Sequence, residues 1–439
     1  MPEKIHLNEK QTWLQRLRLS ASVGAASLAF LASGIDSNPA SAEERVPAQV
    51  ESTPDLIIAF QEDQMVNENS EMSLKIAEAI SHLDDADDDD GELLDNPEIE
   101  LGAKATGPWS FPDQCSEINN DTNRYTNFFR ATRDYGLTPI LNIIPGSTGL
   151  SKIPITHSQR RCFKDTAVSY IHLFASVYKE KGEDDNDGYS DEESKPTMYL
   201  EVFNEVNSEA FAPNQYDRNG NWVMPKHIVR ATDVVYRGSK QAAAKLDVNV
   251  EMITPGLHSQ NRALDFFSTM GRYKKELGIK NQITNCFSWH PYGSENNEPP
   301  DTIHPNLSTI GLADYNTLLK IIDISFIRQD YPICASEYGV KALIPPDKKY
   351  LYPGVTQTSS TLVSEDLQTR FYTKSLKMAR CSERLLMWTL FNAVDDPDGA
   401  WTSGIWRPIV SINDSLEAKP AYEPLHQTIT SIKSGNFSC

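Results

Sequence analysis

The sequence predicts an α/β protein folded as a single (β/α)8 TIM barrel, a closed ring of eight parallel strands with helices outside. Two observations predict it: eight short apolar runs alternate with amphipathic runs, and the alternation is regular along the chain. The steps average about 47 residues from the first strand to the last, and about 44 between the fourth and the seventh. Such regularity favours a closed ring over a long doubly wound sheet. No glycine-rich phosphate loop follows the first strand, which weakens the dinucleotide-binding alternative.

The predicted strands are short runs rich in Ile, Leu, Val and aromatic residues. They span Asp55–Phe60, Glu98–Lys104, Thr138–Ile144, Thr197–Phe203, Asn249–Thr254, Thr284–Trp289, Pro332–Ser336 and Arg384–Thr389. Between them, apolar residues recur at helical spacing. The predicted helices span Leu74–Leu83, Tyr125–Tyr135, Thr166–Lys179, His227–Lys245, Ala263–Leu277, Asp314–Arg328, Thr369–Ser382 and, after the last strand, Glu423–Ser434.

The N-terminal segment has the features of a secretory signal peptide, predicted to span residues 1–42. Basic residues precede a modest apolar stretch, Leu19–Ala32, and Ala40-Ser41-Ala42 is a small-residue cleavage site. An amphipathic or disordered leader is the alternative interpretation. Residues 43–54 are then a polar linker, and residues 55–439 form the barrel domain. We therefore expect a secreted or periplasmic protein, and no later stretch reaches the length of a membrane span.

The charge of the chain limits its partners. The formal net charge is −20 at pH 7. A protein this acidic repels polyanions, so nucleic acid and anionic membranes are not expected as partners.

The six cysteines fit an oxidising compartment without forming a dense disulfide framework. The predicted barrel makes neighbours of two pairs, Cys115 with Cys162 and Cys381 with Cys439. Cys286 and Cys334 lie in predicted strands and are expected to be buried thiols.

An acidic run between the third helix and the fourth strand resembles a calcium-binding loop. Acidic residues recur at alternate positions over Glu183–Asp191, with Gly188 at the sixth position of the loop. The twelfth position is Ser194, where such loops carry a glutamate. A solvated acidic loop is the preferred interpretation, with calcium as the alternative.

Two glutamates, Glu205 and Glu337, end the predicted fourth and seventh strands. A carboxylate at the end of a buried strand is costly unless its charge is used or paired. The carboxyl ends of barrel strands form the face where active sites lie, so these side chains are expected to meet. A pair of carboxyl groups is what cleavage of a glycosidic bond requires. For either glutamate alone, an ion-pair role is the alternative.

The residues around this pair form a set of motifs in strand order. Strand four ends in Asn204-Glu205, strand six in His290-Pro-Tyr292, strand seven in Ser336-Glu337-Tyr338-Gly339, and strand eight carries Trp388. Together they resemble the (β/α)8-barrel clan of retaining glycoside hydrolases (clan GH-A), which includes cellulase-like and β-xylosidase-like families. The resemblance covers essentially the whole mature chain.

The resemblance implies distinct roles for the residues of this set. It implies that Glu205 is the acid/base and Glu337 the nucleophile. Asn204 would bind the 2-hydroxyl of the sugar, and Tyr292 would donate a hydrogen bond to Glu337. No metal or organic cofactor is expected.

Other residues would shape the sugar-binding subsites. The resemblance implies that His290 lines the central subsite and that Trp388 is the platform under the sugar ring. Four tryptophans in apparent βα loops are candidate platforms as well, with loop packing as the alternative: Trp109, Trp222, Trp401 and Trp406.

The chain also departs from the pattern of the clan. Val206 follows the predicted acid/base where the clan often has Pro. Lys104 stands near the position of an Arg of the clan at the end of strand two, and a Lys cannot make the bidentate contact of an Arg.

The expected function is therefore hydrolysis of O-glycosidic bonds in an oligo- or polysaccharide, by double displacement, in a secreted glycosidase. Two alternatives remain open. A transglycosylase would use the same site, and a non-catalytic carbohydrate-binding barrel would keep the aromatic platforms without needing both glutamates.

Overall fold

The protein forms a barrel of parallel strands with helices around it. The computed structural model describes residues 56–66, 69–83, 99–109, 122–145, 153–180, 195–327, 330–409 and 415–439, and for Pro108, Trp109 and Pro145 the backbone only. The strands are β1 (Leu56–Gln61), β2 (Ile99–Trp109), β3 (Thr138–Pro145), β4 (Thr197–Val202), β5 (Asn249–Ile253), β6 (Leu257–His258), β7 (Phe287–His290), β8 (Ile333–Tyr338) and β9 (Leu385–Phe391).

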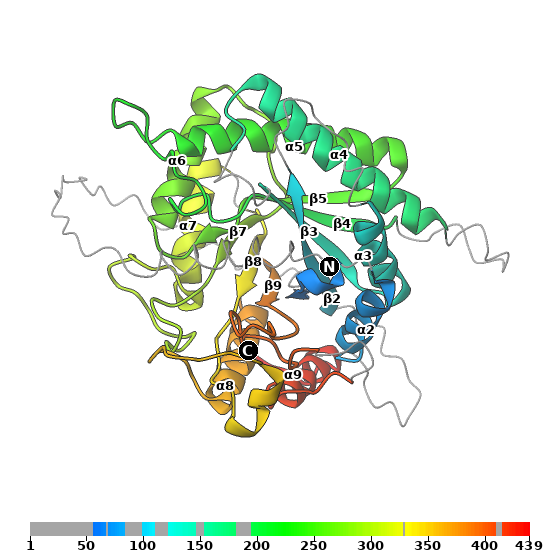
Figure 1. Cartoon of the computed structure of the whole chain (residues 1–439). Coiled ribbons are helices and arrows are strands. Elements are labelled where there is room, and N and C mark those ends of the chain that lie inside the picture. The colour runs from blue at the N-terminus through cyan, green and yellow to red at the C-terminus, as the bar shows by residue number, and fades with distance from the viewer. Residues whose placement is uncertain are drawn as a thin grey trace, which may run out of the picture. The chain divides into compact units, whose positions relative to one another are not determined.

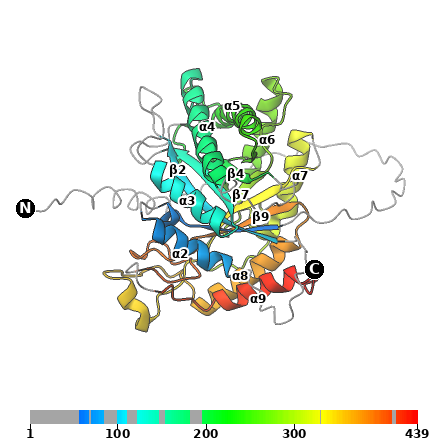
Figure 2. The ribbon, with the colours of Figure 1, turned by 90° about the vertical axis from the view of Figure 1, so that its right-hand side faces the viewer.

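The helices lie between the strands in the sequence. They are α2 (Ser70–Ser81), α3 (Thr122–Asp134), α4 (His157–Lys179), α5 (Met224–Leu246), α6 (Ala263–Glu276), α7 (Tyr315–Phe326), α8 (Glu365–Arg380) and α9 (Tyr422–Lys433). Short 3-10 turns occupy Asp63–Met65, Leu312–Asp314 and Pro346–Leu351. Figure 1 shows α2 to α9 following one another around the strands in chain order. In Figure 2, α2, α8 and α9 lie on one side of the strands and α4, α5 and α6 on the other.

The strands pair in the order expected of a barrel. The ladder runs β5-β4-β3-β2-β1-β9-β8-β7-β6, and every pair in it is parallel. The first strand pairs with the last, for example through Ile57 and Met387. The predicted fifth strand, Asn249–Thr254, is present as β5, and β6 continues it beyond the predicted end. Parallel bridges from Ile253 to Cys286 and from Asn204 to Gly256 connect these pieces to both neighbours, so the ring of eight closes there.

Helices α2, α4 and α8 begin earlier than the apolar pattern predicts, because a polar N-cap precedes each of them, whereas α6 begins at the predicted residue. The largest difference is in α4, predicted from Thr166 and observed from His157. Its N-cap is Thr156, whose side chain accepts a hydrogen bond from the backbone of Gln159, and Gln159 bonds back to the cap. This reciprocal capping box satisfies two backbone donors and starts the helix on a polar turn.

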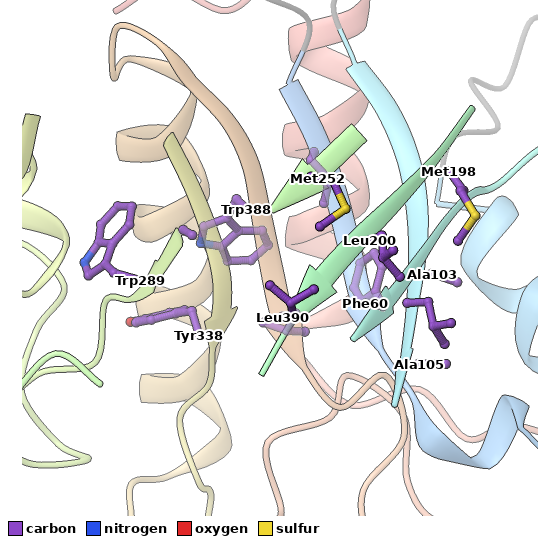
Figure 3. Packing of buried hydrophobic residues seen from close by; sticks show 14 of the residues in the cluster. Phe60, Ala103, Ala105, Met198, Leu200, Met252, Trp289, Tyr338, Trp388 and Leu390 are labelled. Carbon is purple, nitrogen blue, oxygen red and sulfur yellow. The ribbon is translucent and has the colours of Figure 1, made fainter. Parts of the chain in front are cut away.

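Two apolar layers hold the barrel together. The larger layer lies between the sheet and the helices, and Figure 3 shows part of it, including Phe60, Trp289 and Trp388. The smaller layer fills the ring and consists of strand residues such as Ile57, Ala59 and Met387. Successive strand residues point to opposite faces, so neighbours such as Met387 and Trp388 belong to different layers.

A buried ion pair crosses the inside of the ring. Lys104 Nζ of β2 lies 2.6 Å from Glu201 Oε2 of β4, and both side chains are fully buried. Lys104 also donates to the backbone oxygen of Ser336 at 2.7 Å. The Ser336 hydroxyl donates to Glu201 Oε1 at 2.6 Å. Because each charge is both paired and hydrogen-bonded, these contacts offset the desolvation cost of burying the pair, and the network ties β2, β4 and β8 together.

The cysteines differ in part from the prediction. Cys286 and Cys334 are buried as expected but form a disulfide, so their prediction as thiols is wrong. The alternation of the strands predicts burial, whereas the pairing of β7 with β8 brings the two sulfurs together. Cys381 and Cys439, which were predicted only as neighbours, form a disulfide. Cys162 is also disulfide-bonded, and Cys115, its predicted partner, lies outside the described residues.

Removing the internal disulfide is expected to destabilise the barrel. A Cys286→Ala/Cys334→Ala variant should lose about 3 kcal/mol of unfolding free energy, because the cross-link restricts the unfolded chain and its removal leaves small cavities. Urea denaturation followed by tryptophan fluorescence measures the change. An unfolding free energy equal to that of the wild type would show that the bond adds no stability.

Several predictions fall on parts of the chain that the structure does not describe. The signal peptide of residues 1–42, the linker of residues 43–54 and the acidic loop Glu183–Asp191 lie outside the described residues. Across the described part of the chain, no helix has both the length and the apolar character to cross a bilayer.

Candidate active site

The backbone at the end of β4 presents Glu205 in an unusual conformation. Phe203 and Glu205 both have positive φ angles, 68° and 45°. The Glu205 N–H donates to the oxygen of Gly256 at 2.8 Å, which holds the turn against the fifth barrel strand. Side chains larger than glycine adopt this conformation at an energetic cost, and such residues cluster at active sites and ligand clamps. The local strain therefore marks this strand end as a site under a structural demand.

The structure brings the two glutamates together around a histidine. A carboxylate oxygen of Glu205, one of Glu337 and a ring nitrogen of His290 all lie within 4.8 Å of one another. His290 Nδ1 is 3.1 Å from Glu205 Oε1 and 3.8 Å from Glu337 Oε2. Each glutamate is only 8% exposed. Among the described residues, this is the group whose spacing could also hold a metal ion.

Different neighbouring groups act on the pKa values of the two carboxyl groups. Burial raises the pKa of both Glu205 and Glu337. Tyr292 donates a hydrogen bond of 2.8 Å to Glu337 Oε1. Electrostatic interactions with His290 and Lys104, together with this bond, lower the pKa of Glu337 again, whereas the charge of Glu205 raises it. Glu337 therefore has more neighbours that favour its negative charge than Glu205, for which His258 is the one such neighbour among the described residues.

The His290 ring is closely packed against the fifth barrel strand. Its side chain is fully buried, and burial lowers its pKa, which favours the neutral ring. A Cβ atom at position 256 would lie 2.1 Å from His290 Nε2, so only glycine fits there. Gly256 thus lets the ring approach the fifth barrel strand and keeps Nδ1 directed at Glu205.

Asn204 lies beside the pair at the end of β4. Its Oδ1 is buried and has no hydrogen-bond partner among the described residues. A buried amide oxygen without a partner is costly, so such an atom indicates a place for a ligand or a water. The structure therefore brings five of the predicted residues to one place: Asn204, Glu205, His290, Tyr292 and Glu337.

The prediction of a sugar platform at Trp388 is corrected. Trp388 is fully buried in the outer layer, where its ring lies 6.2 Å from that of Tyr338 (Figure 3). Its place in β9 puts its side chain on the helix-facing surface of the sheet. The strand ends at Phe391, which shares the inward face with Met387 by alternation. Phe391, which is partly exposed, is therefore the aromatic residue on the inward face of β9, the eighth strand of the barrel.

The loop tryptophans differ in their exposure to solvent. Trp401 is partly exposed and packs edge-on against Phe391, with ring centroids 4.6 Å apart. Lys341 lies over the Trp401 ring at 3.6 Å. Trp406 is buried and belongs to the core. The side chain of Trp109 lies outside the described residues.

Sequence reasoning missed three residues near the pair. Phe391 lies two residues beyond the predicted end of the last strand, so a longer strand would have found it. Lys104 was recognised only as a departure, yet its charge acts on Glu337. His258 lowers the pKa of Glu205. The short run Leu257–His258, which continues the fifth strand after Gly256, could have indicated it.

No protein-family model matches this chain, and no curated protein matches it. Solved structures do. The AHE enzyme from Alicyclobacillus herbarius superposes with a TM-score of 0.50 at 10% identity, over 82% of this chain and 87% of that one. The exo-β-1,4-mannosidase Op5Man5 from Opitutaceae bacterium strain TAV5 also gives a TM-score of 0.50 at 10% identity, over 87% of this chain and 60% of that one. At this identity the likeness establishes the fold, and it confirms the (β/α)8 barrel.

Proposed function

We propose that the protein is a retaining glycoside hydrolase that cleaves O-glycosidic bonds of an oligo- or polysaccharide. One observation carries the proposal. Glu205 follows β4 and Glu337 lies in β8, and their carboxylate oxygens are within 4.8 Å of each other in a buried site. Retaining glycosidases hold their carboxyl pair about 5–5.5 Å apart, and inverting enzymes about 6.5–9.5 Å, to admit a water. The observed spacing supports the retaining class.

In the first step, Glu337 acts as the nucleophile. Its carboxylate attacks the anomeric carbon, while the protonated Glu205 gives its proton to the glycosidic oxygen. The bond between the anomeric carbon and that oxygen breaks, and the leaving sugar departs as an alcohol. The product is a glycosyl ester on Glu337.

In the second step, Glu205 is a carboxylate and acts as a base. It takes a proton from water, and the water oxygen attacks the anomeric carbon and expels Glu337. Two inversions give net retention of configuration. The unpaired Oδ1 of Asn204 and the inward Phe391 are the groups that we assign to the sugar itself, as hydrogen-bond partner and as apolar contact.

The same proposal includes export. The N-terminal segment has the features of a secretory signal, and the internal disulfides fit an oxidising compartment. We propose that the mature enzyme is secreted or periplasmic. The acidic loop Glu183–Asp191 is a candidate calcium site only in the sequence, and the reaction does not need the ion.

The proposal is tested by the products of a broad screen. The wild type is incubated with chromogenic glycosides and with plant, fungal and bacterial polysaccharides, and proton NMR follows the anomeric signal of the first product. We expect cleavage with retained configuration. Inverted product would exclude the retaining mechanism. New glycosidic bonds in place of reducing ends would identify a transglycosylase, and binding without cleavage a carbohydrate-binding barrel.

Replacing Tyr292 should shift the pH profile of this activity. Tyr292→Phe removes the hydrogen bond that favours the ionised form of Glu337, so the pKa of Glu337 rises. The nucleophile is active when ionised, and it then needs a higher pH. The acid limb of the kcat/KM profile should therefore move to higher pH. An unshifted limb would show that Tyr292 does not act on this carboxylate.

A further inference from the structure

We propose that His258 is a substrate-binding residue on the leaving-group side of the site, where its Nε2–H donates a hydrogen bond to a hydroxyl of the departing sugar. This inference rests on the proposed glycosidase function and extends it. It assigns the chemistry of the leaving group: a sugar, with a hydroxyl beside the bond that is cleaved. Sequence reasoning gave His258 no role.

Two independent observations direct His258 toward the site. In the parallel pairing of β6 with β7, His258 is the register partner of His290. Register partners project from the same face of a sheet, and His290 faces Glu205. Gly256, two residues earlier, also faces inward, because a Cβ there would meet His290 Nε2 and the Ser336 hydroxyl. Residues two apart in a strand share a face, so His258 does too.

The backbone fixes the tautomer of the His258 ring. The Gln260 N–H donates to His258 Nδ1 at 3.1 Å, so Nδ1 carries no proton in the neutral ring. The proton is then on Nε2, which becomes a donor. Nε2 has no hydrogen-bond partner among the described residues, and the side chain is half-buried. A donor of fixed direction, open at the site, is suited to a substrate hydroxyl.

The segment that carries His258 is held rigidly. The Asn207 amide donates to the backbone oxygens of His258 and Gln260, and its Oδ1 accepts from the His258 N–H at 2.9 Å. Asn261 and Arg262 follow with positive φ angles of 56° and 61°. Two consecutive residues of this kind persist only where the surroundings over-determine them, as in a ligand clamp.

The position of His258 relative to Glu205 identifies the leaving-group side. Glu205 protonates the glycosidic oxygen, so the departing group lies on its side of the site. His258 belongs to the strand that accepts the Glu205 N–H through Gly256. The electrostatic interaction with His258 lowers the pKa of Glu205, in agreement with their proximity.

Aromatic surface continues outward from the same segment. The Arg262 guanidinium lies over the Trp222 ring at 4.7 Å. The Tyr216 ring stacks on that of Trp222, with centroids 6.3 Å apart, and Tyr216 is 47% exposed. Exposed aromatic rings beside a fixed donor suit the apolar face and the hydroxyls of a sugar.

The test compares two leaving groups on one glycone. The substrates are a β-1,4-linked gluco-, manno- or xylo-tetrasaccharide that the wild type cleaves, and the 4-nitrophenyl glycoside of the matching disaccharide. Only the first has hydroxyls on its leaving group. His258→Ala should lower kcat/KM on the tetrasaccharide by about 10-fold, and on the nitrophenyl glycoside by less than about 2-fold.

His258→Gln and His227→Ala are the matched variants. A Gln amide can keep a donor near the place of Nε2, so His258→Gln should recover part of the loss on the tetrasaccharide, and it also serves if the Ala variant fails to fold. His227 is a partly buried histidine of α5 outside the site, and its variant should leave both rates unchanged.

The outcomes separate this inference from the proposed function. Equal losses on both substrates, or no loss on either, would overturn the role of His258 and leave the glycosidase intact. A wild type that cleaves neither these pairs nor the broader panel would overturn the glycosidase proposal itself, and this inference with it.

Discussion

Glu337→Gln is expected to be inactive while remaining folded. An amide of nearly the same shape can still accept the hydrogen bond from Tyr292, but it cannot form the glycosyl ester. Loss of the nucleophile should lower kcat by at least about 10^4-fold on any substrate that the wild type cleaves. Initial rates on a chromogenic glycoside measure the loss, and circular dichroism and thermal melting confirm the fold.

The control for this variant is Glu251→Gln. Glu251 lies in β5 and pairs with Lys240 on α5, away from the site. Its neutralisation should change the rate by less than about 2-fold, because the ion pair is remote from the site and a partly exposed pair contributes little to stability. If Glu337→Gln kept more than a small fraction of the wild-type rate, Glu337 would not be the nucleophile, and the carboxyl pair would need another role.

Glu205→Ala should lose activity to an extent that depends on the leaving group. General acid catalysis contributes about 10^2–10^4-fold, and a poor leaving group such as a sugar needs it most. The leaving group of a 2,4-dinitrophenyl glycoside departs as a phenolate without needing a proton. Formation of the glycosyl ester from this substrate should therefore be much less affected. Slow hydrolysis of the ester should then produce a burst of dinitrophenol, which stopped-flow absorbance resolves.

Azide provides the decisive control for the two assignments. It can enter the space left by Glu205→Ala and attack the glycosyl ester without a base, giving a glycosyl azide of retained configuration. In Glu337→Gly it would instead attack the substrate directly and give the inverted azide. Rescue with the configurations exchanged would reverse the roles of the two glutamates.

The fold could be predicted largely from apolar periodicity. All eight predicted strands are present, because buried parallel strands carry short continuous apolar runs. The continuation of the fifth strand as β6 was not predicted, because Pro255-Gly256 lies between the two pieces and such a pair ordinarily ends a strand. The start of α4 was missed because a capping box, and not an apolar residue, begins it.

The site was predictable where a motif and a strand end coincide. Glu205 and Glu337 follow continuous strands, so their meeting follows from the barrel alone. Trp388 was placed wrongly because a resemblance in the order of motifs does not fix which face of a strand a residue occupies, and a shift of one residue reverses that face. The Cys286–Cys334 bond was missed for a related reason, since it depends on the register between two strands.

Lys104 shows how the chain departs from the pattern that it resembles. A Lys in this place is paired with Glu201 inside the ring and not with the nucleophile directly. Its charge nevertheless lowers the pKa of Glu337. The sequence revealed the substitution, and only the three-dimensional arrangement revealed Glu201 as the partner of the buried lysine.

Trapping of the covalent intermediate tests the central claim most directly. The wild type is treated with a 2-deoxy-2-fluoro glycosyl fluoride of the sugar that it cleaves, digested with pepsin and analysed by tandem mass spectrometry. The fluorine at C2 slows both steps, while the fluoride leaving group still permits the first, so the ester accumulates. We predict one added glycosyl group, on Glu337. A label on Glu205 in its place, or inactivation without any covalent label, would contradict the account.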